Sequence, residues 1–461
     1  MSLPSPLSRR QFLVGAAGVA GAAAVAGVTF DPVARALGMT GGGSSATHDR
    51  GVDGNGILVL VALYGGNDGL NTLIPYSDSA YLAARPNLGI PADSVIHLDS
   101  ELGLNPNLKG MKTLWDDKRL AIVRGVGHAN PTFSHFREMD IWQSGDPVND
   151  IATGWIGRYL DQAQGDNPLY ALSLGPTMPI VLQGATTAGA SIPSGTLKLP
   201  GRGDIENAFR TLETPFSGET ALAARVAQSG SDLLTVLHSV NEVLATSPVV
   251  DGTNLEGAGG AAVASGPSGA GAASGAGAAS GAAAASGAAG AGSASRGGRG
   301  GAANAVGEQL GLVARLIKGG LPTRVYMVSV GGFDTHAGEK PTQDALLAQL
   351  DSAVTGFVNE MAATPAGKHV VLMTFSEFGR RVAENASGGT DHGSSAPLFV
   401  AGPGVQGGYY GDEPSLTDLD DGNLAFTTDF RSVYATVADK VLGVDPKAML
   451  EGQTFPALDF V

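Results

Sequence analysis

The sequence predicts a three-layer α/β/α sandwich with a largely parallel central sheet. Short runs of almost uninterrupted apolar residues recur along the chain, which is the pattern of strands buried on both faces of a sheet. Amphipathic helical segments lie between these runs, and such alternation is typical of parallel sheets covered by helices. The predicted strands span residues 57–63, 119–126, 324–330, 369–375 and 396–402.

Four helices support the same architecture. Residues 344–363 repeat apolar side chains at helical spacing, and residues 427–443 begin beside the cap-forming Thr428 and stop at Gly443. Two further amphipathic helices are predicted over 220–245 and 305–321. Between them, residues 257–303 consist almost entirely of Gly, Ala and Ser and lack the side chains needed to form a core. We therefore expect a single domain over 56–461 with a disordered insertion, preceded by a flexible segment over 37–55.

The N-terminus carries an export pattern. Arg9 and Arg10 precede an apolar run rich in Gly and Ala, and Ala34 and Ala36 fit a signal-peptidase site. This pattern predicts a twin-arginine signal over residues 1–36, the translocase as an export partner, and a periplasmic, cell-wall-associated or extracellular product. A membrane anchor is the alternative, because the run is nearly long enough to span a bilayer. Its weak hydrophobicity favours a cleaved signal and no stable anchor.

Composition restricts the chemistry further. The chain has no cysteine, which excludes disulfides, thiolate metal sites and cysteine nucleophiles. Its formal net charge is −15, and loss of residues 1–36 would remove three arginines and one aspartate. An acidic surface argues against binding nucleic acid or anionic membranes, and it repels anionic substrates. A phosphate or sulfate ester would thus need a locally positive site, which metal cations supply.

Polar side chains gather in the loops at the predicted strand ends, where open parallel sheets bind ligands. Four of the eight histidines fall there, together with several carboxylates. Imidazole and carboxylate ligands suit Zn²⁺, Mn²⁺ or Mg²⁺, and two such ions could clamp a displacement at phosphorus or sulfur. In chain order the residues are Asn67, Asp68, His128, Thr132, Ser134, His135, Asp334, His336, Ser376, Glu377, Arg380, Arg381, Asp391 and His392.

Each loop also has a purely structural interpretation. "GGND" and "TDHG" are turn signals, "DTH" fits a helix cap, and "SEFGRR" fits a helix start with an exposed basic turn. The histidines at 48, 97, 238 and 369 lie outside these loops and are expected to be structural. No G-x-S-x-G or G-x-x-x-x-G-K motif occurs, so the sequence offers no support for a serine esterase or a P-loop enzyme.

Several long motifs resemble a known family. "LVLVALYGGNDGLN", "NPTFSHFREMDIWQSG", "GGFDTHAGE", "TFSEFGRRVAENASGGTDHGSSAPLFVAG" and "TTDFRSVYATVADKVLG" are similar, in this order, to domain-of-unknown-function family 1501. That family in turn resembles the alkaline phosphatase and sulfatase superfamily. The resemblance implies an alkaline-phosphatase-like fold and a hydrolase of phosphate or sulfate esters that uses one or two metal ions.

The superfamily pattern also implies roles for individual residues. Asp68 resembles the metal-binding Asp after the first strand, and Thr132 or Ser134 resembles the nucleophile at a helix start. Asp334, His336 and His392 resemble the ligands of one ion. The pattern departs at Glu377–Phe378, where an Asp–His pair is usual, because phenylalanine cannot bind a metal. The number of ions, one or two, is therefore left open.

The resulting hypothesis is an exported, metal-dependent hydrolase of a small-molecule or polymer ester. A divalent cation (Zn, Mn, Mg or Ca) would be held by Asp334, His336 and His392, with Asp68, Glu377 and Asp391 completing the site. Ser134 or Thr132 would attack, His135 or His128 would act as acid or base, and Arg380 would bind a substrate oxyanion. The alternative is a non-catalytic exported binding or scaffold protein on a degenerate hydrolase fold.

Overall fold

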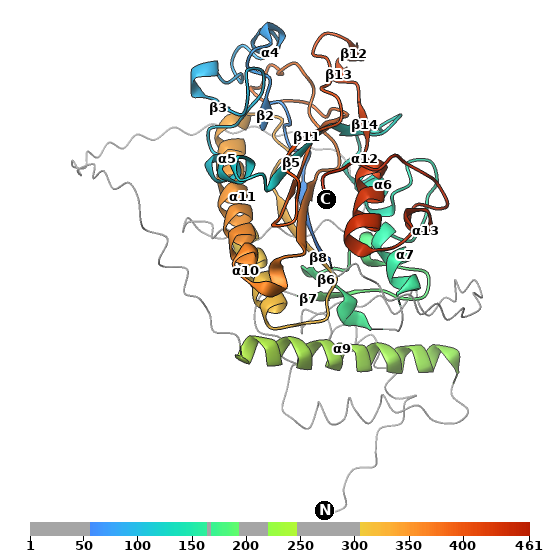
Figure 1. Cartoon of the computed structure of the whole chain (residues 1–461). Coiled ribbons are helices and arrows are strands. Elements are labelled where there is room, and N and C mark those ends of the chain that lie inside the picture. Colours follow the sequence, from blue (N-terminus) through green and yellow to red (C-terminus); the bar gives the residue numbers. More distant parts are fainter. Residues whose placement is uncertain (1–55, 164–166, 193–219, 247–304) are drawn as a thin grey trace, which may run out of the picture. The chain divides into compact units, whose positions relative to one another are not determined.

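The computed structural model describes residues 56–163, 167–192, 220–246 and 305–461 (Figure 1). The elements of these ranges belong to one compact unit. The predicted export signal, the flexible segment 37–55 and the insertion 257–303 lie outside the described residues. Within these ranges, no helix combines the length and the apolar character needed to cross a bilayer.

The main sheet has nine strands within the described residues, in the order β11-β5-β10-β9-β1-β8-β6-β7, with β14 beside β5. All pairings are parallel except those of β10, which runs antiparallel to both β5 and β9. The five predicted strands are confirmed to within one residue at each end. The strands are β1 (Ile57–Tyr64), β5 (Leu120–Gly127), β6 (Ala171–Leu174), β7 (Ala190–Ile192), β8 (Val325–Gly331), β9 (Val370–Phe375), β10 (Ala396–Ala401), β11 (Gly408–Tyr410) and β14 (Thr428–Asp429).

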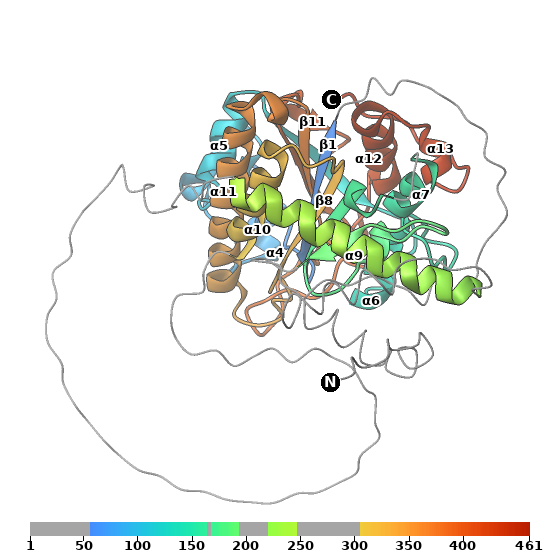
Figure 2. The same ribbon diagram turned by 90° about the horizontal axis from the view of Figure 1, so that it is seen from below.

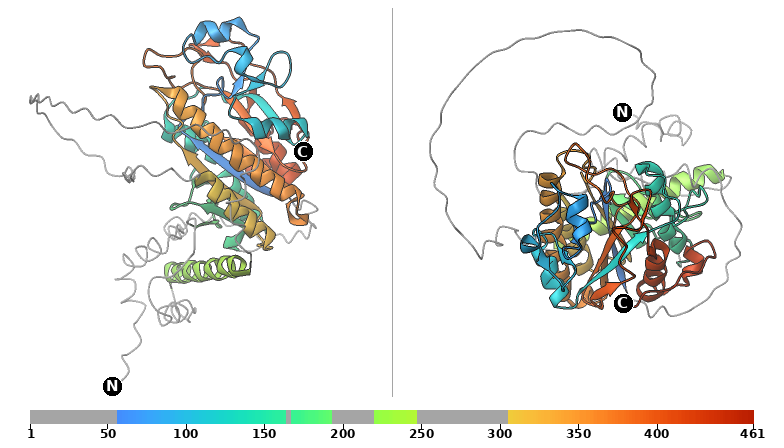
Figure 3. Two further views of the ribbon diagram at one scale, coloured as in Figure 1. Left: turned by 90° about the vertical axis from the view of Figure 1, so that its left-hand side faces the viewer. Right: turned by 90° about the horizontal axis from the view of Figure 1, so that it is seen from above.

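Helices cover both faces of this sheet, which confirms the predicted α/β/α sandwich (Figure 1). One face carries α5 (Lys109–Asp116), α10 (Ala305–Lys318) and α11 (Glu339–Ala362), and Figures 2 and 3 show the last two lying along β1 and β8. The opposite face carries α6 (His135–Ser144), α7 (Trp155–Gln162), α12 (Phe430–Val437) and α13 (Pro446–Met449).

The central strand β1 shows why the apolar runs are uninterrupted. Val59, Val61 and Leu63 belong to the core beneath α10 and α11. Leu58 and Leu60, which point to the other face, belong to the core beneath α7 and α12. Because successive strand residues alternate between faces, both sets must be apolar when both faces are buried. The helix α9 (Ala221–Thr246) adds Leu233 and Leu237, among others, to the first core.

The start of α12 differs from the prediction. Asp429, not Thr428, caps the helix, and its side chain accepts a hydrogen bond from the backbone N–H of Arg431. Thr428 instead pairs with Val126 as part of β14. The helix continues into a π-helical turn, η6 (Ala438–Leu442), and ends as predicted at Gly443, whose φ of 70° is left-handed.

Shorter elements complete the fold. A three-stranded sheet, β2-β4-β3, and a two-stranded sheet, β12-β13, lie apart from the main sheet. These elements are α4 (Ser79–Ala84), β2 (Leu73–Ile74), β3 (Ile96–His97), β4 (Gly103–Leu104), β12 (Leu419–Asp420) and β13 (Asn423–Leu424), with the short helices η1 (Ala92–Ser94), η2 (Pro168–Tyr170), η3 (Ile180–Leu182) and η5 (Pro365–Gly367).

The strand directions determine where loops meet. The carboxyl ends of β1, β5, β8 and β9 share one edge of the sheet, and the antiparallel β10 begins at that edge. Gly65 lets the loop after β1 approach the loop after β8, because a Cβ there would lie 2.3 Å from the backbone nitrogen of Asp334. Its φ of 117° also favours glycine. The predicted site loops are therefore neighbours in space.

Candidate functional site

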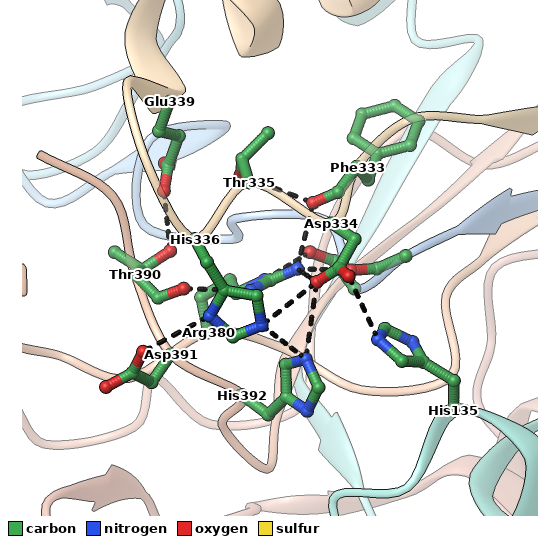
Figure 4. A network of polar contacts seen from close by, with 12 residues as sticks. His135, Phe333, Asp334, Thr335, His336, Glu339, Arg380, Thr390, Asp391 and His392 are labelled. Carbon is green, nitrogen blue, oxygen red and sulfur yellow. Dashed lines mark hydrogen bonds and ion pairs between the residues drawn. The ribbon is translucent and has the colours of Figure 1, made fainter. Parts of the chain in front are cut away.

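Four side chains form a histidine–aspartate cluster at this edge: His135, Asp334, His336 and His392 (Figure 4). Asp334 is central. Its Oδ1 lies 3.1 Å from Nε2 of His336 and 3.3 Å from Nε2 of His392, and its Oδ2 lies 3.5 Å from Nε2 of His135. The Nε2 atoms of His336 and His392 are 2.9 Å apart.

Two loops and a helix start supply the cluster. His135 is the first residue of α6, after β5, and Asp334 and His336 lie between β8 and α11. His392 precedes β10, and its backbone forms an isolated antiparallel bridge with Arg380. The clustering of predicted site residues thus follows from the sheet topology rather than from proximity in the sequence.

Each histidine of the cluster is fixed through its Nδ1 atom. His135 Nδ1 lies 2.8 Å from Oε1 of Glu377, His392 Nδ1 lies 2.8 Å from the carbonyl oxygen of Phe133, and His336 Nδ1 lies 3.2 Å from Oδ1 of Asp391. A carbonyl or carboxylate oxygen accepts hydrogen bonds, so each Nδ1 carries the ring proton. In the neutral rings the lone pairs therefore sit on Nε2, facing Asp334.

The protonation states reinforce this arrangement. Burial lowers the pKa of His392, which keeps its ring neutral at pH 7. Burial acts to raise the pKa of Asp334, but the hydrogen bond from Arg380 and the positive charge of its guanidinium outweigh it and lower the pKa below its ordinary value. The pKa of Asp391 is also lowered, first by its hydrogen bond from Asn385 and then by that from His336.

Hydrogen-bond acceptors therefore converge on one small volume. The Nε2 atoms of His336 and His392 and a carboxylate oxygen of Asp334 face one another at 2.9–3.3 Å, and a proton or a metal cation between them relieves the repulsion of their lone pairs. One ligand atom from each of His135, Asp334 and His392 falls within 4.8 Å of the other two. Nitrogen and oxygen donors of this kind fit a divalent transition metal, so the cluster is a candidate metal centre.

Glu377 and Asp391 support the cluster instead of joining it. Glu377 is buried, and its Oε1 also accepts the backbone N–H of Gly65 at 2.8 Å. Both carboxylates thus orient a histidine through Nδ1, an arrangement common around metal-bound imidazoles. Phe378 stands where the resemblance led us to expect a histidine. The centroid of its ring lies 4.4 Å from that of the His392 ring and 4.9 Å from that of the His135 ring.

The prediction that Arg380 binds a substrate oxyanion is wrong. Its side chain is completely buried, and one Nη2 hydrogen bond of 2.9 Å goes to Asp334. The other N–H groups donate to backbone carbonyl groups of the surrounding loops, at Gly65, Gly66, Phe333 and Thr390. Arg380 therefore connects the loops and lowers the pKa of Asp334, and its complete burial keeps it from a substrate.

Asp68 is not brought into the cluster. It is completely buried and forms an ion pair of 2.5 Å with Arg85, which follows α4. The carboxyl group of Glu339, at the start of α11, is close enough to that of Asp68 to affect its pKa. The Glu339 side chain in turn accepts a hydrogen bond of 2.6 Å from the Thr390 hydroxyl. The structure thus gives Asp68 ionic partners other than the proposed metal.

The two predicted hydroxyl nucleophiles, Thr132 and Ser134, lie in the loop before α6 and differ in their hydrogen bonds. Thr132 donates its hydroxyl hydrogen bond to Glu138 at 2.8 Å. Ser134 is the residue before α6, is exposed, and makes no side-chain hydrogen bond to the helix. His128 is buried 2.7 Å from Glu138, so it is not exposed for acid–base chemistry with a substrate.

Sequence reasoning missed the buried partners Arg85, Glu138 and Glu339. Each lies on or next to a helix, in "YLAARPN", "HFREMD" and "AGEK", where charged residues usually face solvent. The available signal was their position: each lies within a few residues of a helix end near the predicted strand-end loops. Their partners are distant in the sequence and become evident only in the folded chain.

Comparison with known proteins supports the resemblance in part. Residues 271–454, which contain Asp334, His336 and His392, match the model of a family described as "Protein of unknown function (DUF1501)". No protein with a curated description matches this chain.

Two solved structures resemble the chain at 9% sequence identity. One is BT1596, a 2-O GAG sulfatase, with a TM-score of 0.30 over 77% of this chain and 65% of BT1596. The chain thus spans less than two thirds of the length of that protein. The other is Ps i-CgsB, with a TM-score of 0.32 over 86% of this chain and 74% of that one.

Proposed function

We propose that this protein is an exported, metal-dependent hydrolase of phosphate or sulfate esters. The observation that carries the proposal is the histidine–aspartate cluster, in which three imidazoles are held through Nδ1 and turn Nε2 toward Asp334. Such acceptor groups suit a cation, and a cation gives an otherwise acidic protein the local positive charge that an anionic ester needs.

One ion is proposed, because a single ligand group occurs in the part of the chain that is described. His135, Asp334 and His392 would hold it, with His336 beside them. The ion, when bound, would stabilise negative charge on an ester oxygen. His135 thus takes a ligand role in place of the acid–base role expected from sequence, and Glu377 takes an orienting role in place of a ligand role.

Ser134 is the preferred nucleophile of the two hydroxyls. Its side chain is exposed next to His135 at the positive end of the α6 dipole, which stabilises negative charge. In the proposed reaction, Ser134 Oγ bonds to phosphorus or sulfur, the bond to the leaving alcohol breaks, and the serine proton passes to the alcohol. Water then hydrolyses the enzyme ester. The substrate class, a small-molecule or polymer ester outside the cytoplasm, rests on the predicted export signal.

Metal content tests the proposal first. The purified protein is expected to contain one divalent ion per chain, and Asp334→Asn and His392→Ala are expected to lose it. His238→Ala, an exposed histidine on α9, is the matched control and should retain the ion. A ligand present at 100 times its Kd stabilises the folded state by about 2.7 kcal/mol, so a chelator should lower the melting temperature by several degrees.

Turnover of aryl phosphate and aryl sulfate esters then separates an enzyme from a binding protein. Ser134→Ala is expected to abolish turnover and retain the metal, whereas Thr132→Ala should retain most activity. A protein that contains no metal, and whose melting temperature does not change when a chelator is added, would contradict the proposed metal centre. A metal-loaded protein without turnover on either ester class would favour the non-catalytic alternative, which the ring of Phe378 at the cluster makes worth testing.

A further inference from the structure

We propose that Glu138 is a positioning residue of the metal centre, and that it acts through the loop 128–134 on His392. Glu138 lies on α6 and its side chain is completely buried, although it touches no member of the histidine–aspartate cluster in the described contacts. The inference rests on the metal centre proposed above and adds a residue that neither motif nor resemblance indicated.

The Glu138 carboxylate holds both ends of the loop. Its Oε2 accepts a hydrogen bond from Nε2 of His128 at 2.7 Å. Its Oε1 accepts two hydrogen bonds from Thr132, from the backbone N–H at 2.5 Å and from the hydroxyl at 2.8 Å. Charge-assisted hydrogen bonds of this kind are about twice as strong as neutral ones, so the carboxylate fixes the loop firmly.

The loop needs such support because its backbone is strained. Asn130 and Phe133 have φ values of 58° and 56°, in the left-handed region that residues other than glycine adopt less readily. Each such residue costs about 1–3 kcal/mol and persists only where surrounding contacts enforce it. The conformation of Phe133 matters for the site, because its carbonyl oxygen accepts the Nδ1 proton of His392.

This carbonyl group determines which ring nitrogen of His392 carries the proton and how the ring is oriented. With Nδ1 protonated and bonded to Phe133, the Nε2 lone pair of His392 faces Asp334 and is available to a metal. If the loop relaxed, the carbonyl would move and the ring could rotate or exchange its proton to Nε2. Loss of such an orienting partner typically weakens metal affinity 10–100-fold.

A general-base role for Glu138 toward Thr132 fits the contacts less well. Burial acts to raise the pKa of Glu138, but hydrogen bonds from His128 and Thr132 outweigh it, and the pKa is lowered. A carboxylate with a lowered pKa is a weak base at neutral pH. Its three donors also leave it firmly in place, which suits a support better than a proton acceptor.

The test measures Zn²⁺ affinity by competition with a chelator in Glu138→Gln and Glu138→Ala. Zn²⁺ binding to Glu138→Ala is expected to weaken 10–100-fold. Glu138→Gln keeps one acceptor oxygen and should lie between it and the unsubstituted protein. Asp140→Asn makes the same chemical change as Glu138→Gln at an exposed position of the same helix and should bind Zn²⁺ unchanged. Thermal unfolding confirms that each variant is folded, and Glu138→Gln serves if the alanine variant is not.

A second readout does not need the metal. Nitrogen-15 NMR of the histidine rings in the metal-free protein should show His392 as the Nδ1–H tautomer, and Glu138→Ala or Glu138→Gln should shift or broaden that signal. Folded variants with unchanged His392 signals and unchanged affinity would overturn the inference. If the unsubstituted protein binds no Zn²⁺, the metal centre fails and the NMR result alone decides the role of Glu138.

Discussion

Arg380 and Arg381 are adjacent in the sequence but differ completely in their surroundings. Arg380 is buried and connects the loops after β1, β8 and β9. Arg381 is partly exposed, and its Nη2 reaches Asp421 at 3.3 Å. A buried acceptor that loses its donor costs about 1–3 kcal/mol, and Arg380 donates to four backbone carbonyl groups, whereas an exposed ion pair contributes about 0–1 kcal/mol.

We therefore expect Arg380→Ala to lower the free energy of unfolding by about 3 kcal/mol or more, and Arg381→Ala to lower it by less than about 1 kcal/mol. Denaturation in urea measures both. If Arg380→Ala kept full stability and changed only KM, the original expectation of a substrate-binding arginine would be restored.

Individual residues also show where sequence reasoning reaches its limit. The presence of His135 and His392 at strand-end loops was predictable, because strand ends follow from apolar runs. The proposed ligand role of His135 was not, because it depends on Asp334 and His392, which lie far away in the sequence. A ligand and an acid–base histidine are the same residue type in the sequence, and a carboxylate at Nδ1, such as Glu377, accompanies both.

At the level of elements, a buried group of charges joins the end of β1 to the start of α11. Asp68 and Glu339 are both buried, and the guanidinium of Arg85 balances only one of them. Burial and the nearby charge of Asp68 raise the pKa of Glu339 to about 9. Burial also acts on Asp68, but Arg85 outweighs it and the pKa of Asp68 is lowered. The pair therefore holds one proton at neutral pH, on Glu339.

This proton makes stability depend on pH. An unfolded Glu titrates near 4.5, so between pH 4.5 and about 9 the folded state binds a proton that the unfolded state has released. The contribution of Glu339 is thus fully present below pH 4.5 and is lost as the pH rises toward 9, at up to about 1.4 kcal/mol per pH unit. Glu339→Gln keeps an N–H donor that can face Asp68 and an oxygen acceptor for Thr390, but it removes the group that titrates.

We expect Glu339→Gln to flatten the decline in unfolding free energy between pH 6 and 9, measured by urea denaturation at several pH values. Glu360→Gln, at a half-buried position of α11 that pairs with Lys318, is the control and should leave the slope unchanged. If the unfolding free energy of Glu339→Gln declined with pH as steeply as that of the unsubstituted protein, the Asp68–Glu339 pair would not be the source of the pH dependence.

Elements were predicted more fully than their arrangement. The five strands were predicted because double-sided burial leaves uninterrupted apolar runs, as in β1. The antiparallel direction of β10 left no such signal, since its residues are as apolar as those of the parallel strands around it. The start of α12 shifted by one residue because Thr428 and Asp429 both cap helices, and pairing with β5 decided between them.

For the molecule as a whole, net charge would influence the approach of the proposed anionic ester. The formal net charge of −15 repels such a substrate over about a Debye length, roughly 30 Å at 0.01 M salt and about 10 Å at 0.1 M. Raising the ionic strength between these values should therefore lower KM for an aryl phosphate several-fold with little change in kcat. A KM that rises with salt would show that a local positive field outweighs the net charge.

The large separation of the site residues in the sequence also determines when the proposed metal centre can form during synthesis. The oxygen of Phe133 and the ring of His392 that it orients are 259 positions apart. A chain emerges from the ribosome at about 5–20 residues per second, so His392 follows Phe133 by roughly 10–50 s. Until then the nascent chain has only part of the site. Capture of the proposed ion would therefore be a late event in biogenesis, and its identity would depend on the metals available in the compartment where folding is completed.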